Sequence, residues 1–85
     1  MQRYMVIERF KAGTSRAVYE RFRDKGRMLP DGLVYLDSWL SADDSACYQL
    51  METDTPEHFD RWTAHWDDLV AFDVIPLKPK PTGTD

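Results

Sequence analysis

The sequence predicts a single α+β domain whose elements follow the order β-α-β-β-α-β. Three observations support this prediction: four short runs rich in β-branched and aromatic residues, two segments with apolar residues at helical spacing, and a length of 85 residues, which suits one domain. With right-handed crossovers this order gives a four-stranded antiparallel sheet with both helices on one face, the ferredoxin-like arrangement. We expect residues 1–77 to form the domain and the polar, Pro-rich residues 78–85 to form a flexible tail.

The first strand and the first helix are predicted from the N-terminal third of the chain. Residues 4–10 are rich in β-branched, aromatic and Met side chains, and Gly13 after them indicates a turn. The pair Thr14-Ser15 can cap a helix that ends at Gly26, since glycine is suited to the left-handed region. The apolar side of this weakly amphipathic helix consists of Val18 and Phe22.

The middle of the chain predicts a β-hairpin. Leu29-Pro30-Asp31-Gly32 matches a type I turn, because Pro stands at its second position and Gly at its fourth. Residues 33–40 then form the second strand. Small and acidic residues at 41–44 separate it from the third strand at residues 46–52, which indicates a hairpin turn.

The second helix is predicted to begin at Asp54-Thr55-Pro56, because Asp can cap a helix and Pro lacks an N–H group that the first turn would leave unpaired. The apolar residues that follow lie three and four positions apart, the spacing of one helical face. They are Phe59, Trp62, Trp66 and Leu69. Residues 70–77 form the last strand, in which Pro76 predicts a position at an edge or a strand end.

Alternation along the strands sorts their side chains into two sets, one for each face of the sheet. The first set is purely apolar and is predicted to lie under the helices: Met5, Ile7, Val34, Leu36, Leu40, Tyr48 and Leu50. The second set is mixed and is predicted to form the open face: Tyr4, Val6, Glu8, Phe10, Tyr35, Asp37, Trp39, Cys47, Gln49, Met51 and Val74. Because a monomer rarely exposes so large an apolar area, we expect a homodimer in which two open faces meet.

Six residues are candidates for a functional site. Glu8 and Asp37 are candidate catalytic acids or bases, since a carboxyl group enclosed by a dimer has a raised pKa. Two aromatic rings and one amide of the same face are candidate ligand-binding groups: Tyr35, Trp39 and Gln49. Arg27, between the first helix and the following turn, is a candidate anion contact. Interface packing and ordinary ion pairs are the alternative explanation for all six.

The charged residues are unevenly distributed. Residues 1–27 hold 8 basic and 3 acidic side chains, whereas residues 28–85 hold 3 basic and 12 acidic ones. The simplest interpretation is that the basic first helix lies beside the acidic second helix and forms solvated ion pairs with it. The net charge of −4 has the wrong sign for binding nucleic acid or an anionic membrane.

Metal, disulfide and membrane functions are not predicted. Cys47 is the single cysteine, so no intramolecular disulfide can form and a reducing cytoplasm is expected. His58 and His65 lie too far apart along a helix to share one metal ion, and no cofactor is expected. Charged side chains interrupt the apolar run near the N-terminus, which argues against a signal sequence and a membrane span.

Several segments together resemble a known family. They are Arg21-Phe22-Arg23-Asp24-Lys25-Gly26-Arg27 with Pro30-Asp31-Gly32-Leu33, Asp37-Ser38-Trp39, Cys47-Tyr48-Gln49-Leu50-Met51-Glu52, and residues 62–76. On these residues the chain resembles a small bacterial family of unknown function in the dimeric α/β-barrel superfamily. The resemblance implies a homodimer, with a ligand site between the open sheet face and the helices or inside the two-sheet barrel. Because the superfamily includes cofactor-free monooxygenases, lactone isomerases, dehydratases and haem proteins, the resemblance implies no single reaction.

Two functional hypotheses follow. The first is a homodimeric protein that binds a small, partly aromatic metabolite between the open sheet face and the helices, with monooxygenase-like or isomerase-like chemistry that needs no cofactor. Glu8 would then be the acid or base. Tyr35 and Trp39 would stack on the substrate, and Gln49 would orient it. The second hypothesis is a non-catalytic dimerisation or ligand-sensing module in which the same residues only pack, so the sequence leaves open whether the protein is an enzyme.

Overall fold

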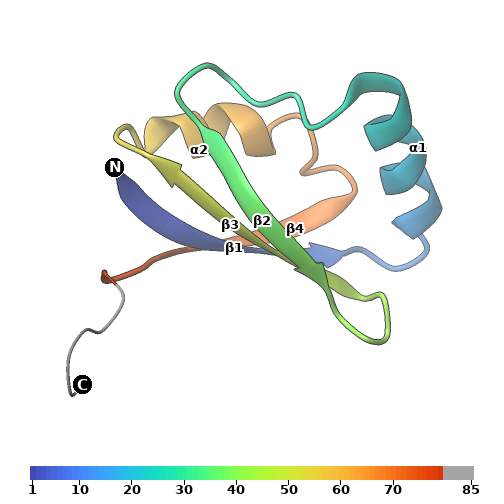
Figure 1. Ribbon diagram of the computed structural model, residues 1–85. Coiled ribbons are helices and arrows are strands. Elements are labelled where there is room, and N and C mark those ends of the chain that lie inside the picture. The colour runs from blue at the N-terminus through green and yellow to red at the C-terminus, as the bar shows by residue number, and fades with distance from the viewer. Residues whose placement is uncertain (80–85) are drawn as a thin grey trace.

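The computed structural model describes residues 1–79 and contains the six elements in the order expected (Figure 1). The strands are β1 (Gln2–Phe10), β2 (Val34–Leu40), β3 (Ala46–Thr53) and β4 (Val70–Pro76), and the helices are α1 (Ser15–Lys25) and α2 (Glu57–Thr63). The strands form one antiparallel sheet in the order β2-β3-β1-β4, and both helices lie on the same face of it. The predicted ferredoxin-like α+β fold is therefore confirmed.

Of the flexible tail expected at residues 78–85, residues 80–85 lie outside the described residues. Within residues 1–79, no helix is long and apolar enough to cross a membrane.

The helix α1 begins and ends where its sequence indicates. Thr14 is its N-cap residue, although its hydroxyl group donates to the carbonyl oxygens of Lys11 (2.7 Å) and Leu69 (2.9 Å) instead of accepting from the first turn. Gly26 follows the last turn with a φ of 67°, and its N–H donates to the Phe22 carbonyl at 2.7 Å. The helix ends here because glycine adopts a positive φ without steric cost.

The helix α2 is shorter than the apolar pattern predicts. It ends at Thr63, and the chain continues in hydrogen-bonded turns, for example from the Trp66 N–H to the Thr63 carbonyl at 2.9 Å. The residue before the helix is Pro56, and no side chain caps its first turn, so the predicted cap by Asp54 is wrong. The turns still direct Trp66 into the core, because each residue in them advances about as far around the axis as in a helix.

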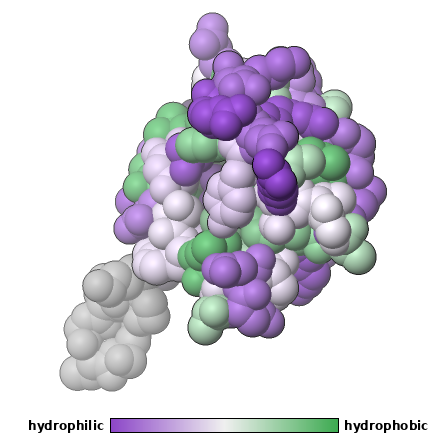
Figure 2. All heavy atoms as spheres, turned by 90° about the vertical axis from the view of Figure 1, so that its right-hand side faces the viewer, coloured by the Kyte–Doolittle hydropathy of each residue, from purple (hydrophilic) through white to green (hydrophobic). Residues whose placement is uncertain are grey.

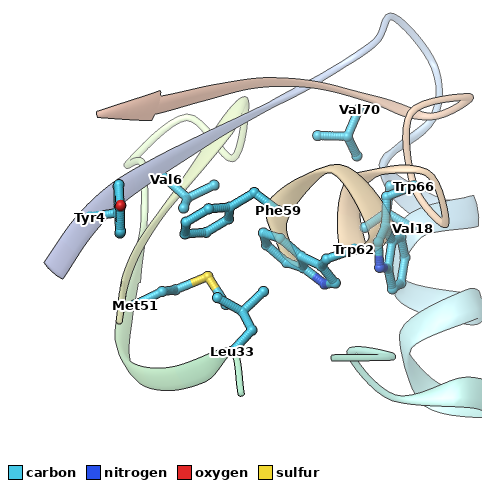
Figure 3. Packing of buried hydrophobic residues seen from close by; sticks show 9 residues of the cluster. All are labelled: Tyr4, Val6, Val18, Leu33, Met51, Phe59, Trp62, Trp66 and Val70. Carbon is cyan, nitrogen blue, oxygen red and sulfur yellow. The ribbon is translucent and has the colours of Figure 1, made fainter. Parts of the chain in front are cut away.

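The core lies between the helices and the sheet (Figure 3). Phe59, Trp62 and Trp66 descend from α2 and the turn after it onto the side chains of β1 and β3. Phe59 meets Tyr4 edge to face, with ring centroids 4.8 Å apart. Trp62 is 1% exposed and packs against Phe72 of β4 at 5.5 Å. These aromatic contacts fix the position of α2 over the centre of the sheet.

The two faces of the sheet are reversed relative to the prediction, except in β2 after Tyr35, where Asp37 and Trp39 lie on the open face and Leu40 on the covered face, as predicted. On β1, Tyr4, Val6 and Glu8 are buried beneath the helices, whereas Met5 and Ile7 point to the open face. The open face carries most of the purely apolar set, including the exposed side chains of Val34, Leu36 and Tyr48. Trp39 of the mixed set and Ile75 of β4 are also exposed there. Alternation separates the two sets correctly on β1 and β3, but it does not say which set the helices cover when both contain large apolar residues.

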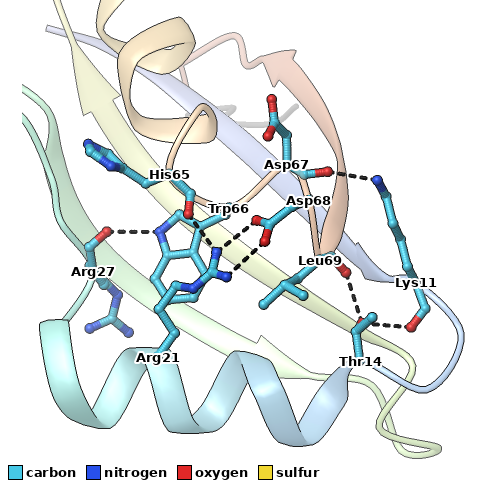
Figure 4. Close-up of polar contacts among 9 residues, drawn as sticks. All are labelled: Lys11, Thr14, Arg21, Arg27, His65, Trp66, Asp67, Asp68 and Leu69. Carbon is cyan, nitrogen blue, oxygen red and sulfur yellow. Dashed lines mark hydrogen bonds and ion pairs between the residues drawn. The ribbon is translucent and has the colours of Figure 1, made fainter.

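One ion pair joins α1 to the turn after α2 (Figure 4). The Arg21 guanidinium donates to both carboxylate oxygens of Asp68, at 2.7 and 2.8 Å, and to the His65 carbonyl at 2.9 Å. The pair holds the pKa of Asp68 below its usual value. The expected attraction between the basic helix and the acidic segment is thus present at this contact. Other basic residues of α1 pair within the helix itself, as Arg16 does with Glu20.

The turn before β2 provides a test of the packing around α2. Gly32 has a φ of 92°, and a Cβ atom placed there would lie 2.6 Å from Cε1 of His58, whose Nδ1 is 3.1 Å from the Thr53 hydroxyl. Gly32→Ala is expected to lower the free energy of unfolding by about 2–4 kcal/mol, since a positive φ and a displaced His58 both destabilise the fold. Gly13→Ala is the control, because Gly13 also has a positive φ but an open surrounding within the described residues. If urea unfolding shows the same loss of unfolding free energy for Gly32→Ala and Gly13→Ala, the close contact with His58 is contradicted.

Candidate functional site

A cavity of about 220 Å³ lies between α1 and the end of the sheet nearest the β2–β3 turn. Aromatic side chains of α1, β1 and the α2 region form most of its walls: Phe10, Tyr19, Phe22, Trp62 and Trp66. Four polar side chains also line it: Glu8, Arg27, Cys47 and Gln49. Figure 2 views this end of the molecule, where weakly polar and hydrophobic surface lies between hydrophilic regions. An apolar cavity with a few polar groups is the usual composition of a small-molecule site.

Glu8 lies on the floor of this cavity, in the middle of the sheet. It pairs with Cys47 of β3 on one side and with Phe72 of β4 on the other, and only 7% of it is exposed. Burial raises the pKa of the Glu8 carboxyl to about 7, and the positive charge of Arg27 opposes this only in part. Glu8 can therefore hold or release a proton near neutral pH, as an acid-base catalyst requires.

Gln49 occupies the next position of the same face, on β3. It is 5% exposed, and its side-chain oxygen Oε1 is buried without a hydrogen-bond donor among residues 1–79. A buried amide oxygen without a donor costs roughly 1–3 kcal/mol, so a donor from a bound molecule would be favourable here. Among residues 1–79, no other buried side-chain nitrogen or oxygen lacks a hydrogen-bond partner.

Arg27 is held at the mouth of the cavity by aromatic residues. Its carbonyl oxygen accepts the indole N–H groups of both Trp62 (2.9 Å) and Trp66 (3.1 Å), the second of which is drawn in Figure 4. Its guanidinium carbon lies 3.7 Å from the ring centre of Tyr35 and 5.0 Å from that of Phe22. Both the backbone and the side chain of Arg27 are thus fixed beside the cavity.

Cys47 faces the same cavity across from Glu8. Burial and the nearby Glu8 carboxylate raise the pKa of its thiol to about 11. The thiol therefore stays protonated at physiological pH and is a poor nucleophile. Its part in the site is to fill space beside the carboxyl group.

The predicted site residues are divided between the two faces of the sheet. Glu8, Gln49 and Arg27 line one cavity, and Tyr35 contacts it through the Arg27 guanidinium. Asp37 and Trp39 lie on the open face, so the prediction that Glu8, Tyr35, Asp37, Trp39 and Gln49 share one face of the sheet is wrong.

A β-bulge in β2 explains this division. Tyr35 pairs with Met51 but Asp37 pairs with Leu50, so the register shifts by one residue around Leu36. The shift turns Asp37 to the face opposite Tyr35, whereas regular alternation would keep them together. Asp37 is exposed there, and one of its carboxylate oxygens accepts the Ser38 N–H at 2.8 Å.

Several lining residues were interpreted from the sequence only as core. Trp62 and Trp66 belong to the apolar stripe of the second helix, and Phe22 belongs to the apolar side of the first. One signal could have indicated that the two tryptophans belong to the site: a buried indole N–H requires a hydrogen-bond acceptor. In the structure both indoles donate to the carbonyl oxygen of Arg27, which was a candidate site residue. Within residues 1–79, no group of three or more His, Cys, Asp or Glu side chains is placed to hold a metal ion.

Comparison with known proteins identifies the family of the chain. Neither the curated proteins nor the solved structures contain a match. A family described as a domain of unknown function, DUF3303, matches residues 2–79, which is nearly the whole sequence. The match includes both helices, all four strands and every residue that lines the cavity. The chain therefore belongs to the DUF3303 family.

Proposed function

We propose that the protein binds a small, partly aromatic molecule in the cavity between the sheet and the helices and exchanges a proton with it through Glu8. One observation supports this above the others: a carboxyl group that is 7% exposed faces a cavity with aromatic walls. Burying such a carboxyl group lowers the stability of the fold, because burial disfavours its charged form. A functional role would account for its presence there. Its pKa of about 7 is close to the value that is best for transferring protons at neutral pH.

The chemistry that these residues favour is an isomerase-like proton transfer. Glu8, as the carboxylate, would take a proton from a carbon next to a carbonyl group, and the carboxylic acid so formed would return it at another position. Gln49 would orient the substrate through its free amide oxygen. The aromatic walls would exclude water from the transfer. A monooxygenase-like reaction would in addition need molecular oxygen as a second substrate.

We further propose that the protein is a homodimer in which the open faces of two sheets meet and form a two-sheet barrel. The open face is apolar at its centre, with Ile7, Tyr48 and Leu50 on the two middle strands. Each of its two ends carries an ion pair, Arg3–Glu52 at one end and Arg9–Asp73 at the other. An apolar centre with a charged rim is typical of protein interfaces. This surface also favours the second candidate function, a dimerisation module without catalysis.

Proton exchange into deuterated water tests the proposed reaction directly. A panel of small aromatic ketones and lactones is incubated with the protein in D₂O, and loss of the C–H signal beside the carbonyl is followed by proton NMR. The wild type is expected to accelerate exchange for at least one compound, and Glu8→Gln is expected to lower that rate about 10²–10⁴-fold because the amide cannot accept the proton. Glu20→Gln, an exposed change on α1, is the matched control. Equal rates for wild type and Glu8→Gln would contradict the proposal.

A further inference from the structure

We propose that the ligand of this cavity is a small aromatic acid whose anionic group binds Arg27 and whose hydrogen-bond donor binds the Gln49 amide oxygen. This inference rests on the proposed function, since it names the class of molecule that the cavity receives. It is drawn from the charges, the free hydrogen-bonding groups and the size of the site.

The Arg27 guanidinium has no anionic partner in the described chain. None of the ion pairs formed among residues 1–79 includes it, although other arginines do form such pairs, Arg21 with Asp68 among them. The Tyr35 ring covers one face of the guanidinium at 3.7 Å, which leaves the N–H groups at its edge free to donate. A guanidinium fixed in this way is suited to bind a carboxylate through two parallel hydrogen bonds.

The electrostatics of the cavity favour an anion. Glu8 is substantially protonated at neutral pH and the Cys47 thiol is fully protonated there, so Arg27 supplies the main charge among the residues that line the cavity. An anion bound at Arg27 would also favour the protonated form of Glu8, since a second negative charge nearby opposes ionisation. In its protonated form Glu8 can donate a hydrogen bond to the ligand, and in its ionised form it remains the base of the proposed proton transfer.

The remaining contacts define the rest of the ligand. The Oε1 atom of Gln49 is buried without a donor, so a hydroxyl or N–H group on the ligand would complete its hydrogen bonding. Phe10, Trp62 and Trp66 offer ring faces and edges to a flat apolar body. The volume of about 220 Å³ suits a single aromatic ring with short substituents, because an apolar cavity of about 150 Å³ is enough to hold benzene.

Two probes of equal shape and different charge test this inference. Binding of 4-hydroxybenzoate and of the neutral 4-hydroxybenzamide is followed in two-dimensional NMR spectra through the indole N–H signals of Trp62 and Trp66 and the side-chain amide of Gln49. We expect the acid to bind roughly ten- to a hundredfold more tightly than the amide, because a hydrogen bond to a charged group is worth that much. Arg27→Met should remove this preference, and Arg27→Lys should retain part of it because the charge remains.

The controls separate failure of the inference from failure of the proposed function. Arg23→Met removes a positive charge from an exposed position on α1, four residues before Arg27, and should leave the preference unchanged. Melting curves and the indole signals show whether each variant is folded. If both probes bind the cavity with equal affinity, or if Arg27→Met keeps the preference, the aromatic acid is the wrong class and the proposed function stands. If neither probe shifts the cavity signals at millimolar concentration, both proposals fail.

Discussion

Glu8→Gln is expected to stabilise the protein at pH 8 by about 3 kcal/mol, although the change removes a buried charged group. An ordinary glutamate in the unfolded chain titrates near 4.5, whereas burial raises the pKa of folded Glu8 to about 7. Above pH 7 the folded protein must therefore keep a carboxylate in an apolar cavity. Glutamine has nearly the same shape and no charge, so it avoids this cost while it keeps the packing against Cys47 and Phe72.

The same change predicts how stability depends on pH. Below pH 4.5 Glu8 is protonated in both the folded and the unfolded state, so its ionisation does not lower the free energy of unfolding. Between pH 4.5 and 7 the unfolded chain has lost the proton that the folded protein retains, so the free energy of unfolding of the wild type falls as the pH rises. Above the pKa of folded Glu8 this fall in the free energy of unfolding is complete. The carboxyl pKa of Asp43 is lowered to about 2 by hydrogen bonds from Ser45 and Ser41, so Asp43 changes the stability only at pH values below 4.5.

Urea unfolding at a series of pH values and one protein concentration measures this effect. The free energy of unfolding of the wild type should fall between pH 4.5 and 7, and that of Glu8→Gln should not show this fall. Glu20→Gln is the control, because Glu20 lies on α1 outside the cavity and forms a pair with Arg16. If Glu8→Gln is less stable than the wild type at pH 8, Glu8 has a partner that the cavity does not show.

Tyr48→Lys is expected to convert the proposed dimer, of about twice 10.0 kDa, into a monomer of 10.0 kDa. Tyr48 lies on the open face of β3, between Trp39 of β2 and Ile7 of β1, and 39% of it is exposed. In an interface with twofold symmetry, one lysine on each chain places two like charges in the apolar centre and leaves them unpaired. The fold of each chain should remain, because the helices cover the other face of the sheet.

Size exclusion with light scattering from low micromolar to near millimolar concentration measures the mass. Tyr48→Phe is the matched control, since it keeps the apolar ring and should remain a dimer. A wild type that is monomeric throughout this range would contradict the proposed contact between open faces. Equal masses for the wild type and Tyr48→Lys would place the interface elsewhere on the molecule.

The order of elements could be predicted from the sequence because each signal for it is local. Gly26 ends α1, the Leu29–Gly32 segment turns the chain, and the apolar residues after Pro56 recur at helical spacing. These signals depend on the backbone preferences of single residues and short segments. The length of α2 was overestimated because turns after Thr63 carry Trp66 into the core as a helix would.

The faces of the sheet could not be predicted in the same way, because they depend on contacts between distant segments. Glu8 and Gln49 belong to the mixed set, which would ordinarily be placed toward solvent, yet the aromatic residues of α2 cover it. The apolar set is left on the open face, where the proposed second copy would cover it. The bulge at Leu36, which moves Asp37 away from Tyr35, has no clear signal in the sequence of β2.

Titration of the Glu8 carboxyl carbon by ¹³C NMR, in protein labelled at glutamate, tests most directly whether Glu8 lies in a cavity beneath the helices. Glu8→Gln assigns the signal, and Glu20 serves as an exposed reference in the same spectra. A midpoint near 7 for Glu8 would agree with a buried carboxyl group that can transfer protons at neutral pH. A midpoint near the ordinary value of 4.5 would place Glu8 in water and contradict both the covered face and the site built on it.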